Sequence, residues 1–139
     1  LNFDAQAFEQ TINLNLISIG YCLQAWLKNI NKGGRLVLVS SSAGLLPLPR
    51  AEGYGASKAA LTYWAKTLSL TLKPHEIFVS VVQPGFIDTP LTERNNFAMP
   101  MMITSQSAAQ QIIQGIHKGK AEINVRCFCA ATLVLLSTG

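Results

Sequence analysis

Cysteine and histidine are scarce in this sequence, and neither forms a pattern typical of a disulfide or a metal site. The three cysteines, Cys22, Cys127 and Cys129, are odd in number and lack the spacing of a disulfide framework. They favour a reducing compartment, and we expect a cytoplasmic protein. Cys127 and Cys129 have no second cysteine pair or histidine cluster beside them, so the sequence predicts no metal site.

Charge is also scarce, at 13% of the 139 residues, and runs of charge of one sign are absent. The 11 basic residues are scattered along the chain, which gives a nucleic-acid partner little support. The apolar tail 127–139 is shorter than the roughly 20 residues that a membrane-spanning helix needs. We expect this tail to be a buried strand or a docking segment, with a peripheral membrane contact as the alternative.

Apolar residues, by contrast, make up 49% of the chain, and their periodicity predicts helices. The first helix covers residues 5–30, begins after Asp4 as N-cap and stops before Gly33. The second covers 53–73 and ends at Pro74. One face of the first is expected to hold Phe8, Ile12, Leu16, Ile19, Leu23, Trp26 and Ile30; one face of the second, Tyr54, Lys58, Leu61, Ala65, Leu68 and Leu72.

A third helix is predicted to open at a capping box formed by Ser107 and Gln110 and to end at Gly119. Its inward residues are expected to be Ala109, Ile112, Ile113 and Ile116.

Short runs rich in β-branched residues lie between these helices. Residues 35–40 and 77–82 are almost wholly apolar, as strands buried on both faces of a parallel sheet are, and 121–125 is a third expected strand. Helices and strands alternate along the chain, which predicts an α/β fold with a doubly wound parallel sheet. The connection 83–102 is long, and connections of that length are often functional.

Tyr54 and Lys58 open the second helix and are the strongest candidates for chemistry. One helical turn separates them, so their side chains share a face. A free phenol has a pKa of about 10 and is a poor base at neutral pH, but a nearby ammonium favours the phenolate. With a serine hydroxyl to hold an oxygen atom of the substrate, this pair could move a proton on or off an alcohol. Tyr-x-x-x-Lys alone is weak evidence, because ordinary packing produces the same spacing.

Several segments in order resemble the short-chain dehydrogenases/reductases. They are "INLNL" (12–16), "LVLVSSSAGL" (36–45), "YGASK" (54–58) and "VVQPGFIDT" (81–89). The resemblance implies a Rossmann-like fold and an NAD(P)-dependent oxidoreductase that interconverts a carbonyl and an alcohol by hydride transfer.

The same resemblance implies a role for each matching residue. Tyr54 would transfer the proton, Ser41 would orient the substrate oxygen, and Asn15 would hold a water that links Lys58 to solvent. Lys58 would lower the pKa of the tyrosine and bind the nicotinamide ribose. The nicotinamide side of the cofactor would contact Tyr54, Lys58, Pro84, Gly85, Ile87 and Thr89. The cofactor would be NADP or NAD, with NADP favoured.

The chain departs from the family pattern at the features that hold the dinucleotide. It has no glycine-rich turn after a strand to hold the pyrophosphate, nor the residue that would select NAD or NADP. Residues 1–139 are therefore expected to be a single partial Rossmann-like domain, the C-terminal portion of such a dehydrogenase. The family commonly dimerises through the helices that match 5–30 and 53–73, so a homodimer or homotetramer is expected.

Two other functions compete with this interpretation. A truncated, non-catalytic module could act through oligomerisation with itself or with an intact relative. A serine hydrolase is suggested by "GASKA" (55–59), which approaches a nucleophile elbow around Ser57, although such an elbow needs a strand directly before it. The substrate is not specified; Phe86, Leu91, Phe97, Met99, Met101 and Met102 suggest an apolar pocket wall and hence an apolar ketone or alcohol.

Overall fold

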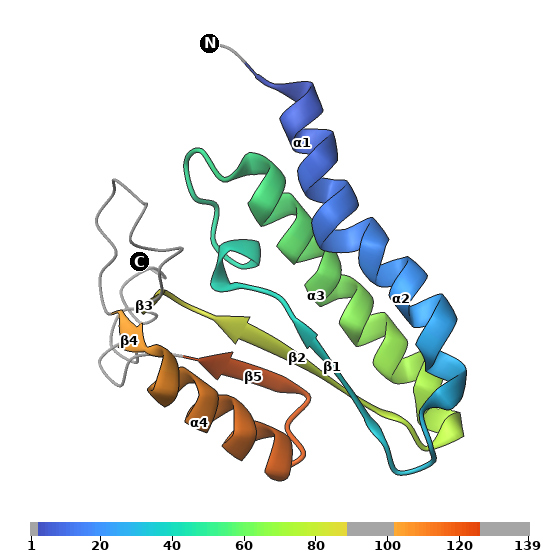
Figure 1. Ribbon diagram of the computed structural model, residues 1–139. Helices are drawn as coiled ribbons and strands as arrows, with labels where there is room; N and C mark the ends of the chain where they lie inside the picture. Colours follow the sequence, from blue (N-terminus) through green and yellow to red (C-terminus); the bar gives the residue numbers. More distant parts are fainter. Residues whose placement is uncertain (1–2, 89–101, 126–139) are drawn as a thin grey trace, which may run out of the picture.

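A three-stranded parallel sheet separates two helical layers in the computed structural model, which describes residues 3–88 and 102–125 (Figure 1). The strands are β1 (Arg35–Val39), β2 (Phe78–Pro84) and β5 (Glu122–Val125), in the spatial order β1-β2-β5. Val37 pairs with Ser80, and Val82 pairs with Ile123. This arrangement confirms the predicted α/β fold with a parallel sheet.

The central strand β2 carries the most deeply buried residues because a neighbouring strand lies on each side and helices cover both faces. Val81 and Val82 are 2% and 0% exposed. β1, in contrast, has no neighbour on its outer side among the described residues, and Val39 is 54% exposed. Both faces of β1 are nevertheless covered as predicted, because Leu36 and Leu38 pack on one side of the sheet and Val37 packs on the other.

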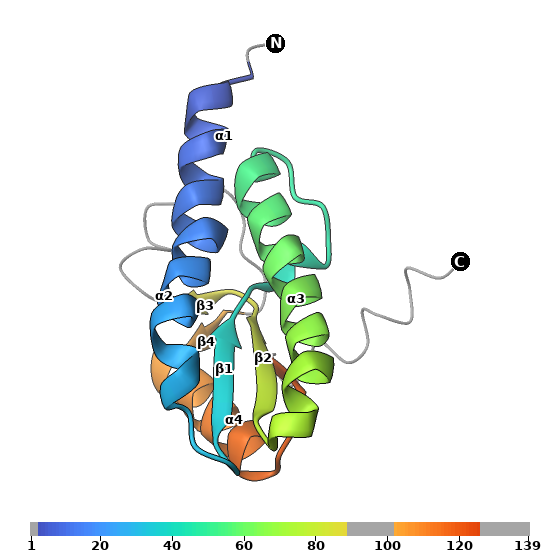
Figure 2. The ribbon, with the colours of Figure 1, turned by 90° about the vertical axis from the view of Figure 1, so that its right-hand side faces the viewer.

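The first helical layer consists of two long rods that run in the same direction on one face of the sheet (Figure 2). One rod contains α1 (Ala5–Ile12), a π-helical turn (Asn13–Ile17), α2 (Ser18–Trp26) and a 3₁₀ turn (Leu27–Asn29). The other is α3 (Glu52–Leu72), which a 3₁₀ turn at Lys73–His75 extends. As predicted, Asp4 caps the first rod: its Oδ1 accepts a hydrogen bond from the Ala7 amide at 2.9 Å.

The core between this layer and the sheet contains Leu38, Leu61, Ala65, Leu72, Ile77, Val79 and Val81. Leu16, Ile19, Leu27, Ile30 and Leu68 pack against it from the helices. Trp26 was predicted on the same face as Leu23 and Ile30 but is 67% exposed. Leu23, which is 8% exposed, and Leu27, four residues later, take the inward positions at this end of the rod.

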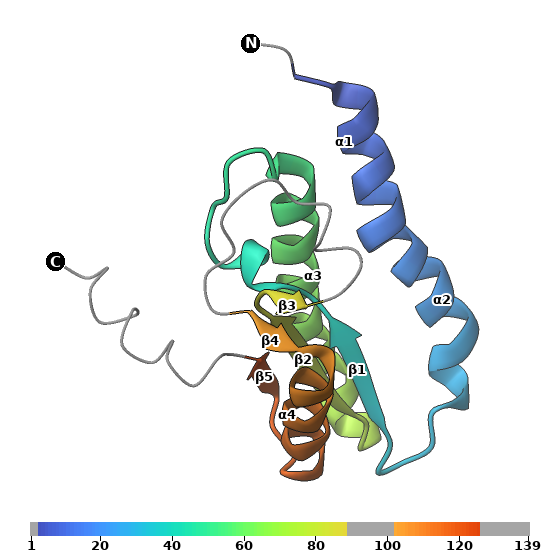
Figure 3. The same ribbon diagram turned by 60° about the vertical axis from the view of Figure 1, so that its left-hand side comes forward.

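The second layer is the single helix α4 (Ser105–His117), which lies on the opposite face of the sheet from α3 (Figure 3). It packs against β2 and β5 through Ala108, Ile112 and Ile116. The predicted N-cap of this helix, Ser107, is wrong by three residues. Thr104 is the N-cap, and its Oγ1 accepts a hydrogen bond from the Ser107 amide at 3.2 Å.

The inward face of α4 also differs from the prediction in two residues. Ala109 is exposed and Ile113 is 52% exposed, whereas Ala108 and Gly115 are buried. A Cβ atom on Gly115 would lie 2.8 Å from the Ile123 side chain. The helix can approach β5 this closely because position 115 has no side chain.

The long connection after β2 contains a small element that the sequence did not predict. β3 (Ile87–Asp88) pairs in parallel with β4 (Ile103–Thr104), with Ile87 opposite Ile103. The Ile103 amide also donates to the Phe86 carbonyl at 3.2 Å. The two strands form a separate small sheet that joins the beginning and the end of the connection.

Candidate active site

Tyr54 and Lys58 lie together in the first turns of α3. The Lys58 Nζ is 5.6 Å from the centroid of the Tyr54 ring. Tyr54 is 42% exposed, so its phenol can reach a bound molecule, while Lys58 is partly buried. The helix begins at Glu52, which places both side chains near its N-terminus and near the carboxyl ends of β1 and β2.

Lys58 is anchored to the end of β1. Its Nζ donates a hydrogen bond to the Val39 carbonyl at 3.1 Å. Partial burial removes water from the ammonium and lowers the pKa of Lys58 below its ordinary value. Because an ammonium has three protons, two remain for other acceptors at this site.

Ser41 directly follows β1 and Ser40, in extended backbone with φ −162° and ψ 155°. It caps the 3₁₀ turn η3 (Ser42–Gly44): its Oγ accepts a hydrogen bond from the Ala43 amide at 3.2 Å. A hydroxyl that accepts in this way still has its own proton to donate. Ser41 is therefore held in place by its own loop and can contact a substrate oxygen.

The loop η3 packs directly on the N-terminal turns of α3. A Cβ atom on Gly44 would lie 2.6 Å from the Ala59 amide nitrogen and 2.7 Å from the Lys58 carbonyl carbon. A Cβ atom on Gly55 would lie 3.1 Å from the Ala43 carbonyl oxygen. These close approaches bring the Ser41 loop against the turn of α3 that holds Tyr54 and Lys58.

Asn15 lies in the middle of the π-helical turn of the first rod, a geometry that is rare and often found at functional sites. Its Nδ2 donates to the Ser57 hydroxyl at 3.1 Å, and the Ser57 hydroxyl donates to the Tyr54 carbonyl at 2.7 Å. The sequence did not indicate this relay. It joins Asn15 to the backbone of the tyrosine through a fully buried side chain.

The position of Ser57 contradicts the serine-hydrolase interpretation. Ser57 lies inside α3, is 0% exposed and gives its proton to a helix carbonyl. A nucleophile elbow would instead place the serine in an exposed turn directly after a strand.

Pro84, Gly85 and Ile87 lie where the sequence predicts, at the carboxyl end of β2. Pro84 is the last residue of that strand, and the Gly85 amide donates to the Val125 carbonyl at 3.1 Å. Ile87 opens β3. Thr89, the remaining predicted cofactor residue, lies outside the described residues, as do Leu91, Phe97, Met99 and Met101 of the predicted apolar wall and the tail 127–139.

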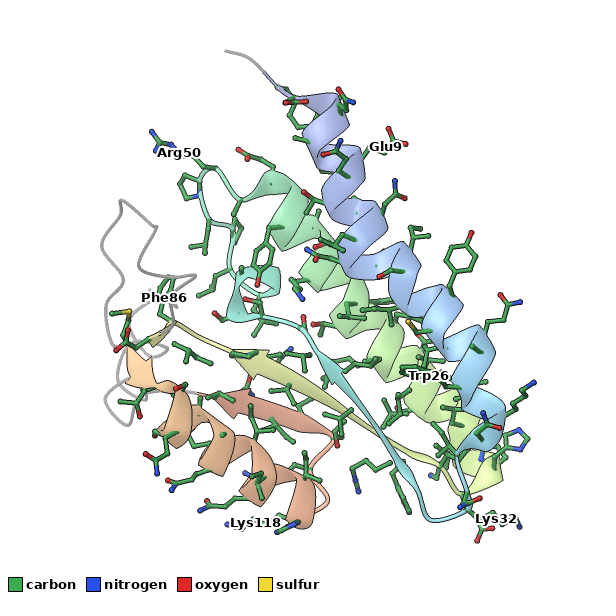
Figure 4. The ribbon with its side chains drawn as sticks, viewed as in Figure 1. Glu9, Trp26, Lys32, Arg50, Phe86 and Lys118 are labelled. Atoms are coloured by element: carbon green, nitrogen blue, oxygen red, sulfur yellow. The ribbon has the colours of Figure 1, made fainter. Side chains whose placement is uncertain are left out.

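A hollow of about 490 Å³ lies beside Tyr54, between α1 and the loop before α3. Phe3 and Phe8 form part of its wall, with their ring centroids 5.6 Å apart. Arg50 also borders it, but its charged end points outward, away from the helices (Figure 4). The side of this hollow next to α1 combines Phe3, Ala7 and Phe8 with the polar residues Asp4 and Thr11.

Among residues 3–88 and 102–125, no group of three or more His, Cys, Asp or Glu side chains could hold a metal ion. No helix in the same part of the chain is long and apolar enough to cross a membrane. The one cysteine described, Cys22, is a free, exposed thiol.

A family model described as short chain dehydrogenase matches residues 1–100. The chain belongs to this family. The match covers Asn15, Ser41, Tyr54, Lys58 and the segment after β2, in the order expected from the sequence. Membership of the family establishes the kind of protein, while the roles of these individual residues stay predictions.

Similar proteins are longer than this chain. An uncharacterized oxidoreductase from Myxococcus xanthus is 35% identical over 115 residues, which are 81% of this chain and 46% of the relative. A 3-ketodihydrosphingosine reductase from Dictyostelium discoideum is 32% identical over 134 residues, 86% of this chain and 40% of that protein. This chain therefore spans less than half the length of these two relatives.

A solved structure supports the same fold. A short chain dehydrogenase from Burkholderia cenocepacia, in complex with NADP, superposes with a TM-score of 0.81 at 25% identity. The superposition covers 97% of this chain and 56% of that one. The parallel sheet and its helical layers thus form part of a Rossmann-like dehydrogenase fold.

Proposed function

We propose that this chain forms the catalytic part of an NAD(P)-dependent oxidoreductase that interconverts a carbonyl and an alcohol. One observation carries the proposal: Lys58 places its ammonium 5.6 Å from the centroid of the exposed Tyr54 ring, beside the loop that holds Ser41. Tyr54 would exchange a proton with the substrate oxygen. Ser41 would donate a hydrogen bond to the same oxygen.

The described residues fit the nicotinamide end of such a cofactor. Lys58 has two ammonium protons left for ribose hydroxyls after its bond to Val39. Gly85 is exposed at the carboxyl end of β2 and leaves room for a flat ring near its backbone. The cofactor, when bound, would supply or accept the hydride.

The described residues hold no glycine-rich turn between a strand and a helix that could grip the pyrophosphate. We therefore propose that residues 1–139 are one partial Rossmann-like domain. The residues that bind the pyrophosphate would belong to a longer parent protein. NADP is the favoured cofactor, since the Burkholderia structure holds NADP.

An apolar ketone or alcohol is the proposed substrate class. The hollow beside Tyr54 has an aromatic wall at Phe3 and Phe8, and Phe86 and Met102 lie at the ends of the connection after β2. A panel of ketones of rising chain length should show rising kcat/KM, because each added methylene group would be buried. A flat profile would contradict this substrate class.

Replacing the phenol tests the proposed chemistry. Tyr54→Phe removes only the hydroxyl of an exposed ring and should abolish cofactor-dependent turnover, because no other group would transfer the proton. Tyr63→Phe is the matched control: it lies on the same helix and is 75% exposed. Turnover by Tyr54→Phe at the rate of Tyr63→Phe would contradict the assignment.

The alternative of a non-catalytic module rests on the exposed apolar side chains of the first helical layer. Leu14, Ile17, Tyr21, Tyr63 and Leu70 are all between 45% and 75% exposed. Under either proposal, we expect the chain to self-associate through the rods that contain α1–α2 and α3. Oligomer formation without any binding of NADPH or NADH would favour the alternative.

A further inference from the structure

Lys58 is fixed at two points by consecutive residues at the end of β1. The Val39 carbonyl accepts a hydrogen bond from the Lys58 Nζ at 3.1 Å, and the Ser40 hydroxyl donates to the Lys58 carbonyl at 2.8 Å. One bond holds the ammonium and the other holds the backbone of the same residue. Neither bond is local, because 19 and 18 positions separate the partners in the chain.

Ser40 takes part in a short buried chain of hydroxyl groups. Its Oγ lies 2.7 Å from the Oγ1 of Thr62, and the two residues are 3% and 6% exposed. A hydroxyl has only one proton, and Ser40 gives its proton to the Lys58 carbonyl. The Thr62 hydroxyl must therefore donate to Ser40, which sets the direction Thr62 to Ser40 to Lys58.

Thr62 follows Lys58 by four residues, so the two lie on one face of α3, one turn apart. Gly44 adds a steric limit on the same turn, since a Cβ there would meet the Lys58 carbonyl carbon at 2.7 Å. Two hydroxyl bonds and one close backbone approach thus prevent α3 from sliding along β1 at the position of Lys58.

We propose that Ser40 and Thr62 are positioning residues that hold the Lys58 turn of α3 against the end of β1, so that the ammonium stays at the Val39 carbonyl. The inference rests on the proposed function, in which the lysine lies beside the tyrosine and binds the cofactor ribose. Ser40 and Thr62 touch neither the phenol nor the ammonium; they act through the Lys58 carbonyl. A purely structural pair of buried hydroxyls would stabilise the fold without changing the behaviour of the ammonium.

Two substitutions at position 62 separate these roles. Thr62→Val keeps the shape of the side chain and removes the hydroxyl, whereas Thr62→Ser keeps the hydroxyl and removes a methyl group. Ser40→Ala removes both the bond to Thr62 and the bond to the Lys58 carbonyl. Ser69→Ala is the control: Ser69 is on the same helix, and its hydroxyl bonds only to the Lys66 carbonyl, at 2.7 Å.

The first measurement is an NMR titration of the Lys58 side chain in the whole chain, labelled with carbon-13 at lysine Cε and assigned with Lys58→Arg. Ser40→Ala should move the titration midpoint toward that of a free lysine, because a released ammonium regains water. Thr62→Val should move it in the same direction by less. Thr62→Ser and Ser69→Ala should leave it unchanged.

The second measurement is the pH dependence of turnover with NADP and an alcohol. Ser40→Ala should lower kcat roughly tenfold to a hundredfold and shift the pH profile, with little change in KM for the alcohol, as misplacement of a catalytic group does. Thr62→Ser should retain the parent profile and Thr62→Val should not.

The outcomes distinguish the two proposals. Absence of turnover in the parent chain would count against the proposed function, and the titration would still decide the role of Ser40 and Thr62. An unchanged Lys58 midpoint in both Ser40→Ala and Thr62→Val would overturn the positioning role. If Ser40→Ala fails to fold, the Lys58 midpoints of Thr62→Val and Thr62→Ser are compared instead. Equal midpoints in these two variants would overturn the positioning role.

Discussion

At the scale of single residues, the candidate site depends on one lysine held in an environment that disfavours its charge. Lys58 is partly buried, and loss of water lowers the pKa of its ammonium. The carbonyl of Val39 compensates in part by accepting a hydrogen bond from the Nζ. This cost is typical of functional residues, which are often kept despite being unfavourable for stability.

Stability should therefore depend on pH through Lys58. The folded pKa lies below that of the unfolded chain, so the unfolded chain binds more protons between the two values, and stability rises with pH across that window. At neutral pH the penalty is fully present. Lys58→Met should remove this rise, leave stability at neutral pH equal or higher, and abolish turnover.

Urea unfolding of parent and Lys58→Met between neutral and alkaline pH would measure the difference directly. Lys58→Arg, which keeps a positive charge throughout, is the control. A parent chain whose stability advantage over Lys58→Met grows toward neutral pH would show that the lysine stabilises the fold, contrary to this account.

The residues of the site also show what the sequence could predict. The positions of Tyr54 and Lys58 follow from helical spacing, and the capping bond of Asp4 follows from its residue type. The relay from Asn15 to Ser57 could not be predicted, because it depends on a π-helical turn and on the distance between two helices. Side-chain contacts between separate elements leave no periodic pattern in the sequence.

At the scale of elements, the contact between η3 and α3 determines the shape of the site. Position 44 lies so near the backbone of Lys58 and Ala59 that only a residue without a Cβ fits without a shift. The same contact brings the loop that contains Ser41 to the N-terminal end of α3, where Tyr54 lies.

Gly44→Ala should consequently destabilise the chain by about 1–3 kcal/mol, as overpacking in a tight contact does. Gly20→Ala is the matched control: its Cβ would meet only Trp64, at an ordinary 3.7 Å, inside α2. That change should be stabilising by up to about 1 kcal/mol, because alanine favours helix. Urea midpoints of the two variants should move in opposite directions, and equal midpoints would show that η3 can move away from α3.

Helices and strands were predicted well where buried residues recur periodically. They were predicted poorly where a local contact determines where an element begins or ends. The three main strands and the three helices follow the apolar pattern. The start of α4 does not, because Thr104 is part of β4 and its hydroxyl also caps the helix. β3 and β4 were missed because two-residue strands are too short to show alternation.

At the scale of the whole molecule, the described residues present two exposed apolar surfaces. One is the outer side of β1, where Val39 is 54% exposed. The other is the outer face of the first helical layer, where Ile17, Tyr21, Ala60 and Trp64 border a shallow hollow between α2 and α3. Exposed apolar surfaces of this kind favour association with another protein surface.

We expect a charge on this helical face to weaken self-association. Ile17→Asp should shift the chain toward monomer, because association would then desolvate a carboxylate with no partner. Ile113→Asp is the control, since Ile113 is 52% exposed on α4, on the opposite side of the sheet. Sedimentation velocity distinguishes the two variants. Equal distributions of monomer and oligomer in both would place the contact elsewhere.

The most direct test of the central claim is the melting temperature of the chain with NADPH and with NADH. A ligand that binds only the folded state stabilises it by about 2.7 kcal/mol when its concentration is 100 times Kd. The account predicts a rise in melting temperature with NADPH and a smaller rise with NADH, both retained in Tyr54→Phe. No rise with either cofactor at millimolar concentration would contradict the claim that this chain holds the nicotinamide end of a dehydrogenase site.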